Sequence, residues 1–223
     1  MKKLDSDISF ILLAVILINF AIVFVGSEFN NPIREEAFAT KFSCFELLIS
    51  AYLSLNVFLL RNKNNNLVSL KTSHIIWLII AIGFIYLACD EIGEWHERID
   101  AFTHIYFHIQ ETALTDSLDD LIIGLYFITG LCFLYAYKKE LYLYFRETWN
   151  LFIVGFILTV FYIVFDALTN RYDFLPFLFG DNSTTKTMFL NITFLEDKIK
   201  IFAEGIFIAG FYWCKQISYK LSV

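Results

Sequence analysis

The amino-acid sequence predicts an all-α fold, a polytopic transmembrane helical bundle, on two grounds. Of its 223 residues, 58% are hydrophobic and only 18% are charged, a balance typical of integral membrane proteins. Its apolar runs of about 17 to 21 residues are long enough to cross a ~30 Å hydrocarbon core as helices. Runs of this length favour helices over barrel strands, because a helix satisfies its own backbone hydrogen bonds in lipid.

Six such runs are expected to form six membrane spans within a single transmembrane domain that covers residues 1–223. The first three lie near residues 8–26, 43–60 and 74–91. The first follows Lys2 and Lys3, and its apolar run of about 18 residues exceeds the apolar core of a secretion signal, so a retained helix is expected. The third, HIIWLIIAIGFIYLAC, is almost entirely apolar until it reaches a cluster of charges.

The last three spans are expected near residues 120–137, 149–166 and 198–214. Ser117 to Asp120 place capping and acidic residues at the start of the fourth span, where helix N-termini favour them. Trp149 begins the fifth span, as in the aromatic belts of membrane interfaces. The sixth is entered through the charged stretch EDKIK, residues 196–200. No stretch of the chain remains for a soluble domain.

The positions of lysine and arginine predict that both termini face the cytoplasm, because cytoplasmic loops retain positive charge. With the N-terminus inside, ten of these residues fall in inner segments and five in outer loops. The inner ten are Lys2, Lys3, Arg61, Lys63, Lys71, Lys138, Lys139, Arg146, Lys215 and Lys220, and the outer five are Arg34, Lys41, Arg98, Arg171 and Lys186. The expected partners are the lipid bilayer and, in a homo-oligomer, further copies of the chain, with no nucleic acid among them.

Within CDEIGEWHERID, residues 89–100, four carboxylates and one histidine fall between positions 90 and 97. Asp90, Glu94 and Glu97 recur at steps of four and three, so they are expected to share one helical face, with His96 nearby. Like charges this close repel one another unless a positive partner holds them. Glu91 is expected to be an ordinary solvated residue of the helix end.

Three other predicted spans carry polar residues at helical spacing near the same membrane face. These stripes are Glu46, Ser50 and Ser54 on the second span, Thr159, Tyr162 and Asp166 on the fifth, and Glu196, Asp197, Lys200 and Glu204 on the last. Lys200 is expected to pair with Glu196 or Glu204, which lie one turn away on either side. A charge within a span costs about 2.5 to 3.5 kcal/mol at the bilayer centre. The stripes are therefore expected to face the bundle interior and to form an outward-facing polar site.

Cation or proton handling is the leading functional hypothesis for this acidic site. Rings of carboxylates select cations, and acids within a membrane relay protons. Six helices can form a small transporter or, in a homo-oligomer, part of a pore. A noncatalytic membrane subunit whose acidic outer face recruits a partner is a further alternative.

A divalent metal ion is the candidate cofactor, since carboxylate and imidazole ligands suit zinc, iron or manganese, and carboxylates alone suit calcium. The candidate ligands are Asp90, Glu94, His96, Glu97, His104 and His108. The spacing of His104 and His108 is a weak signal, and two residues of a membrane interface are the simpler interpretation. A metal-activated water would make the protein a membrane hydrolase, with Glu94 or Glu97 as the catalytic base. The sequence leaves open whether the protein is an enzyme.

Residues from about 84 to 216 resemble a group of uncharacterised bacterial polytopic membrane proteins. The motifs that carry this resemblance are an acidic pair followed by His-Glu at the end of one helix, here DEIGEWHE, and Glu-Asp-x-x-Lys at the start of the last helix, here EDKIK. Asp166 ends the intervening helix. The resemblance implies a six-helix fold, a shared site and a location in a bacterial inner (plasma) membrane, and it implies no activity.

Overall fold

The computed structural model describes residues 2–27, 32–63, 72–109, 118–169 and 174–222, and every regular element within these ranges is helical. The elements are α1 (Lys2–Ser27), α2 (Pro32–Asn62), α3 (Ile75–Gly93), α4 (Trp95–Phe107), α5 (Leu118–Ala136), α6 (Lys138–Tyr144), η2 (Arg146–Thr148), α7 (Trp149–Thr169), α8 (Phe174–Phe179) and α9 (Ser183–Ser222). The all-α prediction is confirmed. Each of the six ranges predicted to span a membrane lies on a helix, with at most one residue outside it, although α2 and α9 are much longer than the predicted ranges.

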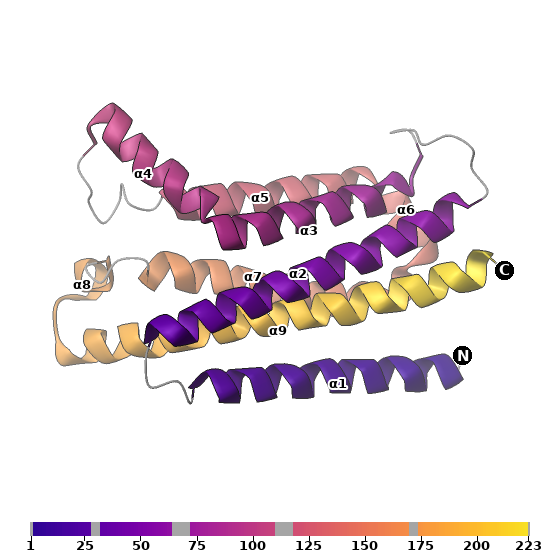
Figure 1. Ribbon diagram of the computed structural model, residues 1–223, viewed down its shortest axis with the longest axis horizontal. Helices are drawn as coiled ribbons and strands as arrows, with labels where there is room; N and C mark the ends of the chain where they lie inside the picture. The colour runs from indigo at the N-terminus through magenta and orange to yellow at the C-terminus, as the bar shows by residue number, and fades with distance from the viewer. Residues whose placement is uncertain (1, 28–31, 64–71, 110–117, 170–173, 223) are drawn as a thin grey trace.

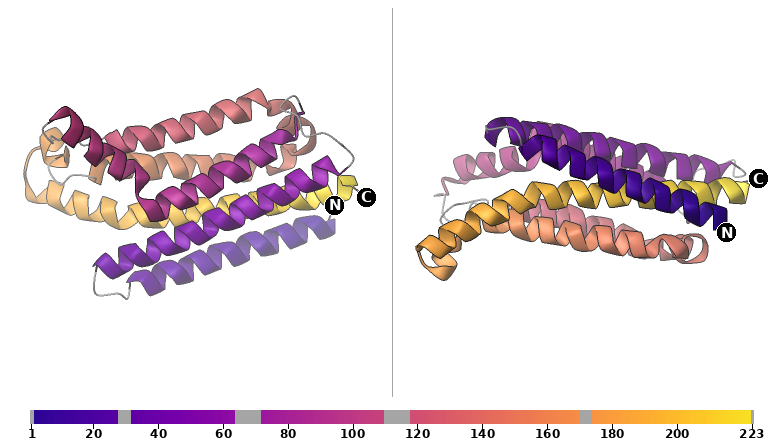
Figure 2. Two further views of the ribbon diagram at one scale, coloured as in Figure 1. Left: turned by 45° about the horizontal axis from the view of Figure 1, so that its top comes forward. Right: turned by 90° about the horizontal axis from the view of Figure 1, so that it is seen from below.

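The long helix α9 lies at the centre of the bundle (Figure 1). Helices α1, α2 and α7 pack along α9, and α3 packs on α2. Helix α5 contacts α3, α4 and α7. The long helices run along a common axis, with both chain termini at one end of the bundle, and α4 projects from the opposite end (Figures 1 and 2).

Aromatic side chains fill the core between α3, α9 and the turn that precedes α7. The ring of Trp77 packs edge-on against Phe145, with the centroids 4.7 Å apart, and against Phe211 at 6.4 Å. Trp77 and Phe145 are completely buried, together with Ile76. Large aromatic rings in edge-to-face contact contribute strongly to packing, so this core fixes α9 against α3.

Helix α1 approaches α9 closely at Gly205. A Cβ atom at this position would collide with Asn19 and Val15 of α1, so the contact requires a glycine. Asn19 is almost completely buried, and its Nδ2 donates a hydrogen bond of 2.8 Å to the carbonyl of Ile201. The small residue and the polar side chain together hold α1 on the bundle.

A buried ion pair joins α2 to α6 near the end of the bundle that carries the termini. The Glu140 side chain is completely buried and accepts hydrogen bonds from Nε of Arg61 (2.8 Å) and Oγ of Ser73 (2.7 Å). The guanidinium carbon of Arg61 lies 3.9 Å from the centroid of the Tyr144 ring, in the geometry of a cation–π contact. These four residues, which we call the Arg61 cluster, connect the end of α2, the start of α3 and α6. Arg61 was expected only as a loop charge.

Three described helical segments are long and apolar enough to cross a membrane: Phe38–Asn62, Ile75–Gly93 and Arg146–Thr169. A fourth is added if Leu121–Ala136 and Lys138–Tyr144, which meet at 64°, form one bent span. This number is smaller than the six predicted. The apolar part of α1, Ser9–Val25, is shorter, and α9 carries charged residues where the sixth span was placed. Two residues of the charge count, Lys71 and Arg171, lie outside the described ranges.

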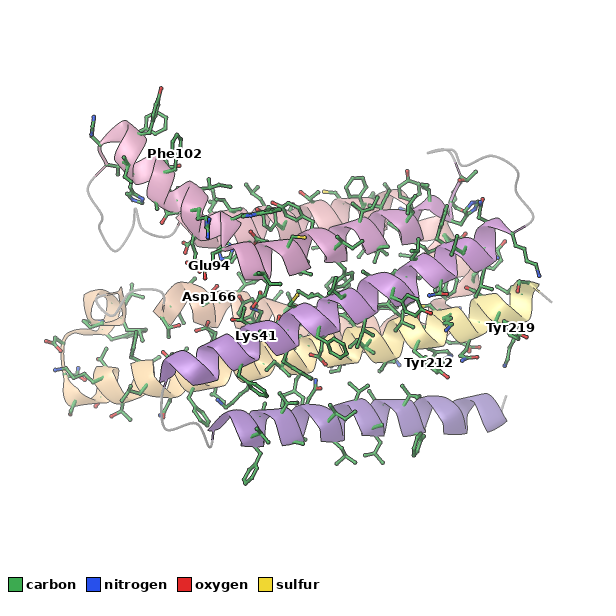
Figure 3. All side chains as sticks on the ribbon, viewed as in Figure 1. Lys41, Glu94, Phe102, Asp166, Tyr212 and Tyr219 are labelled. Atoms are coloured by element: carbon green, nitrogen blue, oxygen red, sulfur yellow. The ribbon has the colours of Figure 1, made fainter. Side chains whose placement is uncertain are left out.

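The helix α3 stops at Gly93 instead of continuing along the acidic stretch. Glu94 adopts the left-handed conformation (φ 50°), and its N–H donates to the carbonyl of Asp90 at 2.7 Å. Helix α4 then starts at Trp95 in a new direction, and Phe102 points away from the bundle (Figure 3). The prediction that Asp90, Glu94 and Glu97 share one helical face is therefore wrong, because the periodicity is interrupted between them.

Candidate functional site

Polar side chains of α2, α3 and α7 meet on one stretch of α9. Three α9 residues, one turn apart, each contact a different helix: Lys200 contacts Glu91 of α3, Glu204 contacts Ser43 of α2, and Glu196 contacts Thr169 of α7. We call the surrounding set the acidic cluster; it consists of Ser43, Glu46, Glu91, Tyr162, Asp166, Thr169, Glu196, Lys200 and Glu204. The polar stripes predicted on separate helices are brought together in this way.

Lys200 and Glu91 form the central ion pair of the acidic cluster. The Nζ atom of Lys200 donates to both carboxylate oxygens of Glu91, at 2.5 and 2.6 Å, and the two side chains are only 17% and 16% exposed. The same Nζ lies 5.3 Å from the ring centroid of Tyr162. Two expectations are thereby corrected. Glu91 is not a solvated helix end, and Lys200 pairs with Glu91 across helices instead of with a neighbour on its own helix.

Two buried carboxyl groups, those of Glu46 and Glu204, lie deeper along α2 and α9. Glu204 accepts a hydrogen bond of 2.7 Å from Oγ of Ser43, and Glu46 lies one turn after Ser43 on the same buried face, followed by Ser50 and Ser54. One carboxyl oxygen of Glu46 and one of Glu204 have no hydrogen-bond partner among the described residues. A buried polar oxygen without a partner is costly, so these two oxygens are candidate acceptors for a proton or another cation.

A second carboxyl pair joins α7 to α9 at the entry of the last predicted span. Oγ1 of Thr169 donates to Oε2 of Glu196 at 2.6 Å, and the carboxyl group of Asp166 on α7 is close enough to that of Glu196 for their charges to interact. Burial and then the charge of Asp166 raise the pKa of Glu196 above its ordinary value. Neighbouring carboxylates repel each other, and the repulsion is relieved when one of them binds a proton. This pair is therefore a candidate site for a proton.

Asp90 fixes the junction between α3 and α4. Its buried carboxylate accepts a hydrogen bond of 3.1 Å from the backbone N–H of His96, and its other oxygen lies 2.8 Å from Nδ1 of the same residue. The first contact satisfies one of the free N–H groups at the start of α4, as capping side chains do. Asp90 and His96 thus close the acidic cluster on the side of α4.

A cavity of about 1170 Å³ extends from the acidic cluster between α3, α5, α7 and α9. At one end its lining includes the ionisable residues Asp90, Glu91, His96, Lys200 and Glu204. Toward the other end it is lined by Leu134, Lys138, Thr148 and Trp149. Most of the wall between the two ends is aliphatic and aromatic.

Several residues proposed from the sequence lie apart from the acidic cluster. Glu94 and Glu97 are exposed at the α3–α4 junction, and Figure 3 shows Glu94 there. His104 is buried on α4 with its Nδ1 3.0 Å from Oδ1 of Asp100, whereas His108 is exposed at the end of the helix, in the left-handed conformation. Asp197 follows Glu196 on α9 at the edge of the cluster.

No group of three or more His, Cys, Asp or Glu side chains within the described ranges is placed to hold a metal ion. His96 lies 2.8 Å from Asp90 through Nδ1 and 3.8 Å from Glu97 through Nε2, and Nδ1 of His104 lies 3.0 Å from Asp100. The divalent metal ion and the hydrolase that would use it remain predictions from the sequence. The four cysteines are free thiols.

Sequence reasoning missed three members of the acidic cluster, Ser43, Glu91 and Thr169, although helical spacing offered a signal for each. Glu91 lies seven residues after Phe84 and four after Leu87, and both of these pack against the core. Ser43 and Thr169 lie one turn from Glu46 and Asp166, respectively. Extending each stripe by one turn would have found them.

Replacing Glu196 with glutamine is expected to flatten the pH dependence of stability. Because the pKa of Glu196 is raised above its ordinary value of about 4.3, the folded protein keeps a proton at pH values where the unfolded chain has lost it. The free energy of unfolding therefore falls as pH rises from about 4.3 toward the raised pKa. Glutamine does not titrate, so the Glu196→Gln variant loses this contribution.

Thermal unfolding in detergent at several pH values measures this effect. Asp181→Asn is the matched control, because the Asp181 side chain is 70% exposed. Its stability is expected to follow the wild-type pH dependence. If the stability of Glu196→Gln depends on pH as that of the wild-type protein does, the raised pKa does not belong to Glu196.

One protein-family model matches residues 8–214, nearly the whole chain, and its description reads Domain of unknown function (DUF8692). The matched range includes the acidic cluster, the cavity and the Arg61 cluster. No curated protein and no solved structure matches the chain.

Proposed function

The chain belongs to the family described as Domain of unknown function (DUF8692), and because this family brings no activity with it, we propose a function from the acidic cluster itself. The protein is a multi-pass membrane protein that handles cations at this cluster, and the proton is the cation that its geometry favours. The observation that carries the proposal is the carboxyl pair of Asp166 and Glu196 beside the buried Lys200–Glu91 ion pair.

The partners of the carboxyl groups support a proton over a larger cation. Glu91 already pairs with Lys200, and Asp90 already contacts His96. The charge of Asp166 favours a proton on the neighbouring Glu196 carboxyl group. Acids held in this way within a membrane protein are typical of proton relays.

The proposed topology has six membrane spans, with both termini in the cytoplasm. The ten-to-five distribution of lysine and arginine supports this orientation, and both termini lie at the same end of the bundle, as an even number of spans requires (Figure 1). In the last span, the charged side chains of Glu204 and Lys200 contact Ser43 and Glu91 inside the bundle. The resemblance to bacterial membrane proteins supports a plasma-membrane location, where the protein acts as a transporter or as a pore of a homo-oligomer.

Proton flux into liposomes tests the proposal. The purified protein is reconstituted with a pH-sensitive dye inside, and a membrane potential is imposed. The wild-type protein is expected to acidify the interior, and Asp166→Asn and Glu196→Gln are expected to slow this by about tenfold or more, since a relay that loses its proton-binding group loses its path. The same liposomes given sodium or potassium gradients without a pH gradient separate metal cations from protons.

Asp181→Asn is the control for a surface carboxylate and should conduct as the wild-type protein does. In intact cells, an impermeant maleimide should label Asp181→Cys from the outside in a cysteine-free background, which checks the orientation. Absence of proton and cation flux from correctly folded wild-type protein would refute the proposed function. It would favour the noncatalytic subunit in its place.

A further inference from the structure

The cavity between α3, α5, α7 and α9 is a groove, open along one side, that is large enough for a lipid-sized ligand. Its volume is about 1170 Å³, whereas sites for drug-sized ligands occupy roughly 300 to 1,000 Å³. Phe127, Phe152, Phe156 and Phe207 contribute to its apolar wall. A space of this size and lining within a membrane is suited to hydrocarbon chains.

The charged end of the same cavity carries both signs. Three acids, Asp90, Glu91 and Glu204, and two bases, His96 and Lys200, line it. The hydroxyl groups of Tyr86 and Tyr126, 2.6 Å apart, lie on the same wall. The apolar wall and the charged end together have the polarity pattern of a single amphiphile.

We propose that this cavity binds one zwitterionic phospholipid that carries an amine in its headgroup, as phosphatidylethanolamine does. The acyl chains occupy the aromatic part of the cavity, and the headgroup lies beside the Lys200–Glu91 pair and the His96–Asp90 contact, with its ammonium group toward Glu204. An anionic headgroup without an amine, as in phosphatidylglycerol, brings its phosphate to an end of the cavity where Lys200 already pairs with Glu91 and His96 already contacts Asp90, and it offers no ammonium group to Glu204, so it binds less well. This inference goes beyond proton handling, because lipid binding can be measured without any flux.

Two glycines give a way to fill the cavity without disturbing the fold. Gly83 of α3 and Gly130 of α5 line the cavity, and a Cβ atom at either position would meet no other atom within 4 Å. Leucine is also a better helix former than glycine. Gly124, on the same helix as Gly130, is equally open but does not line the cavity. Gly130→Leu and Gly124→Leu are thus a matched pair.

The test is native mass spectrometry of the protein released from nanodiscs of equal parts phosphatidylethanolamine and phosphatidylglycerol. The wild-type protein is expected to retain one phosphatidylethanolamine, Gly124→Leu to retain it equally, and Gly130→Leu to lose about tenfold in occupancy, with Gly83→Leu as a second cavity variant. The mass of each lipid-free variant verifies its identity, and its melting temperature verifies that it is folded.

Four results would overturn the proposal: no retained lipid, preferential retention of phosphatidylglycerol, equal retention in all variants, or a wild-type dimer that Gly130→Leu alone converts to a monomer. The last would assign the cavity to a second copy of the chain. A protein that binds the lipid but conducts no protons would keep this inference while refuting the proposed function, and the reverse result would do the opposite.

Discussion

Replacing Glu140 with alanine is expected to lower the free energy of unfolding by about 3 to 5 kcal/mol, the cost of leaving one partner of a buried ion pair uncompensated. Glu140 is completely buried, and Arg61 and Ser73 both donate to its carboxylate. Without it, the guanidinium group remains between α2 and α6 with no counter-charge. Unfolding by a denaturing detergent, followed by tryptophan fluorescence, measures the change.

Glu147→Ala is the matched control, since Glu147 is exposed only seven residues further along the chain. It is expected to change stability by less than about 0.5 kcal/mol. The double variant Arg61→Met with Glu140→Met should regain most of the loss, because an apolar pair of similar size replaces the ion pair without leaving a charge. Equal effects of Glu140→Ala and Glu147→Ala would mean that the Arg61 cluster does not hold the helices together.

Replacing Lys200 with methionine is expected to abolish proton flux. The substitution leaves the Glu91 carboxylate, only 16% exposed, without its positive partner, and an uncompensated buried carboxylate takes up a proton and holds it. The Lys200→Met variant then has neither the positive charge of Lys200 nor the negative charge of Glu91 at the centre of the acidic cluster. The same liposome assay that tests the proposed function measures the rate.

Lys200→Arg keeps the charge and should conduct at a reduced rate, because a planar guanidinium group does not reproduce the position of Nζ. Lys186→Met, at an exposed lysine of the same helix, should conduct normally. Combining Lys200→Met with Glu91→Gln should restore the folded yield of protein without restoring flux. Normal flux through Lys200→Met would remove Lys200 from the mechanism.

Hydropathy located the helices well, because the length of an apolar run is a local property of the chain. The six predicted ranges all lie on helices. Periodicity also placed Glu46, Ser50 and Ser54 correctly on one buried face of α2. The break at Glu94 was missed, since CDEIGEWHE contains no proline, and the glycine before the break gives only a weak signal.

The sequence did not predict which residues of different helices pair with each other. Whether Lys200 meets Glu91 or a neighbour on α9 depends on how α3 and α9 are aligned along their axes, and no local pattern encodes that alignment. The same holds for Arg61 and Glu140, which are 79 positions apart. Charged residues were therefore easier to assign to a face than to a partner.

The length of α9 sets the depth of the acidic cluster in the membrane. Its 40 residues extend for about 60 Å at 1.5 Å per residue, roughly twice the thickness of the hydrocarbon core. In the proposed topology residues 198–214 lie in that core, and about 22 Å of helix stands in water or among headgroups before the span begins. Glu196 then lies at the water boundary and Glu204 about 12 Å beneath it. A proton reaching Glu196 from solution would need no channel, and the resistance to transport would lie in the remaining apolar thickness below Glu204.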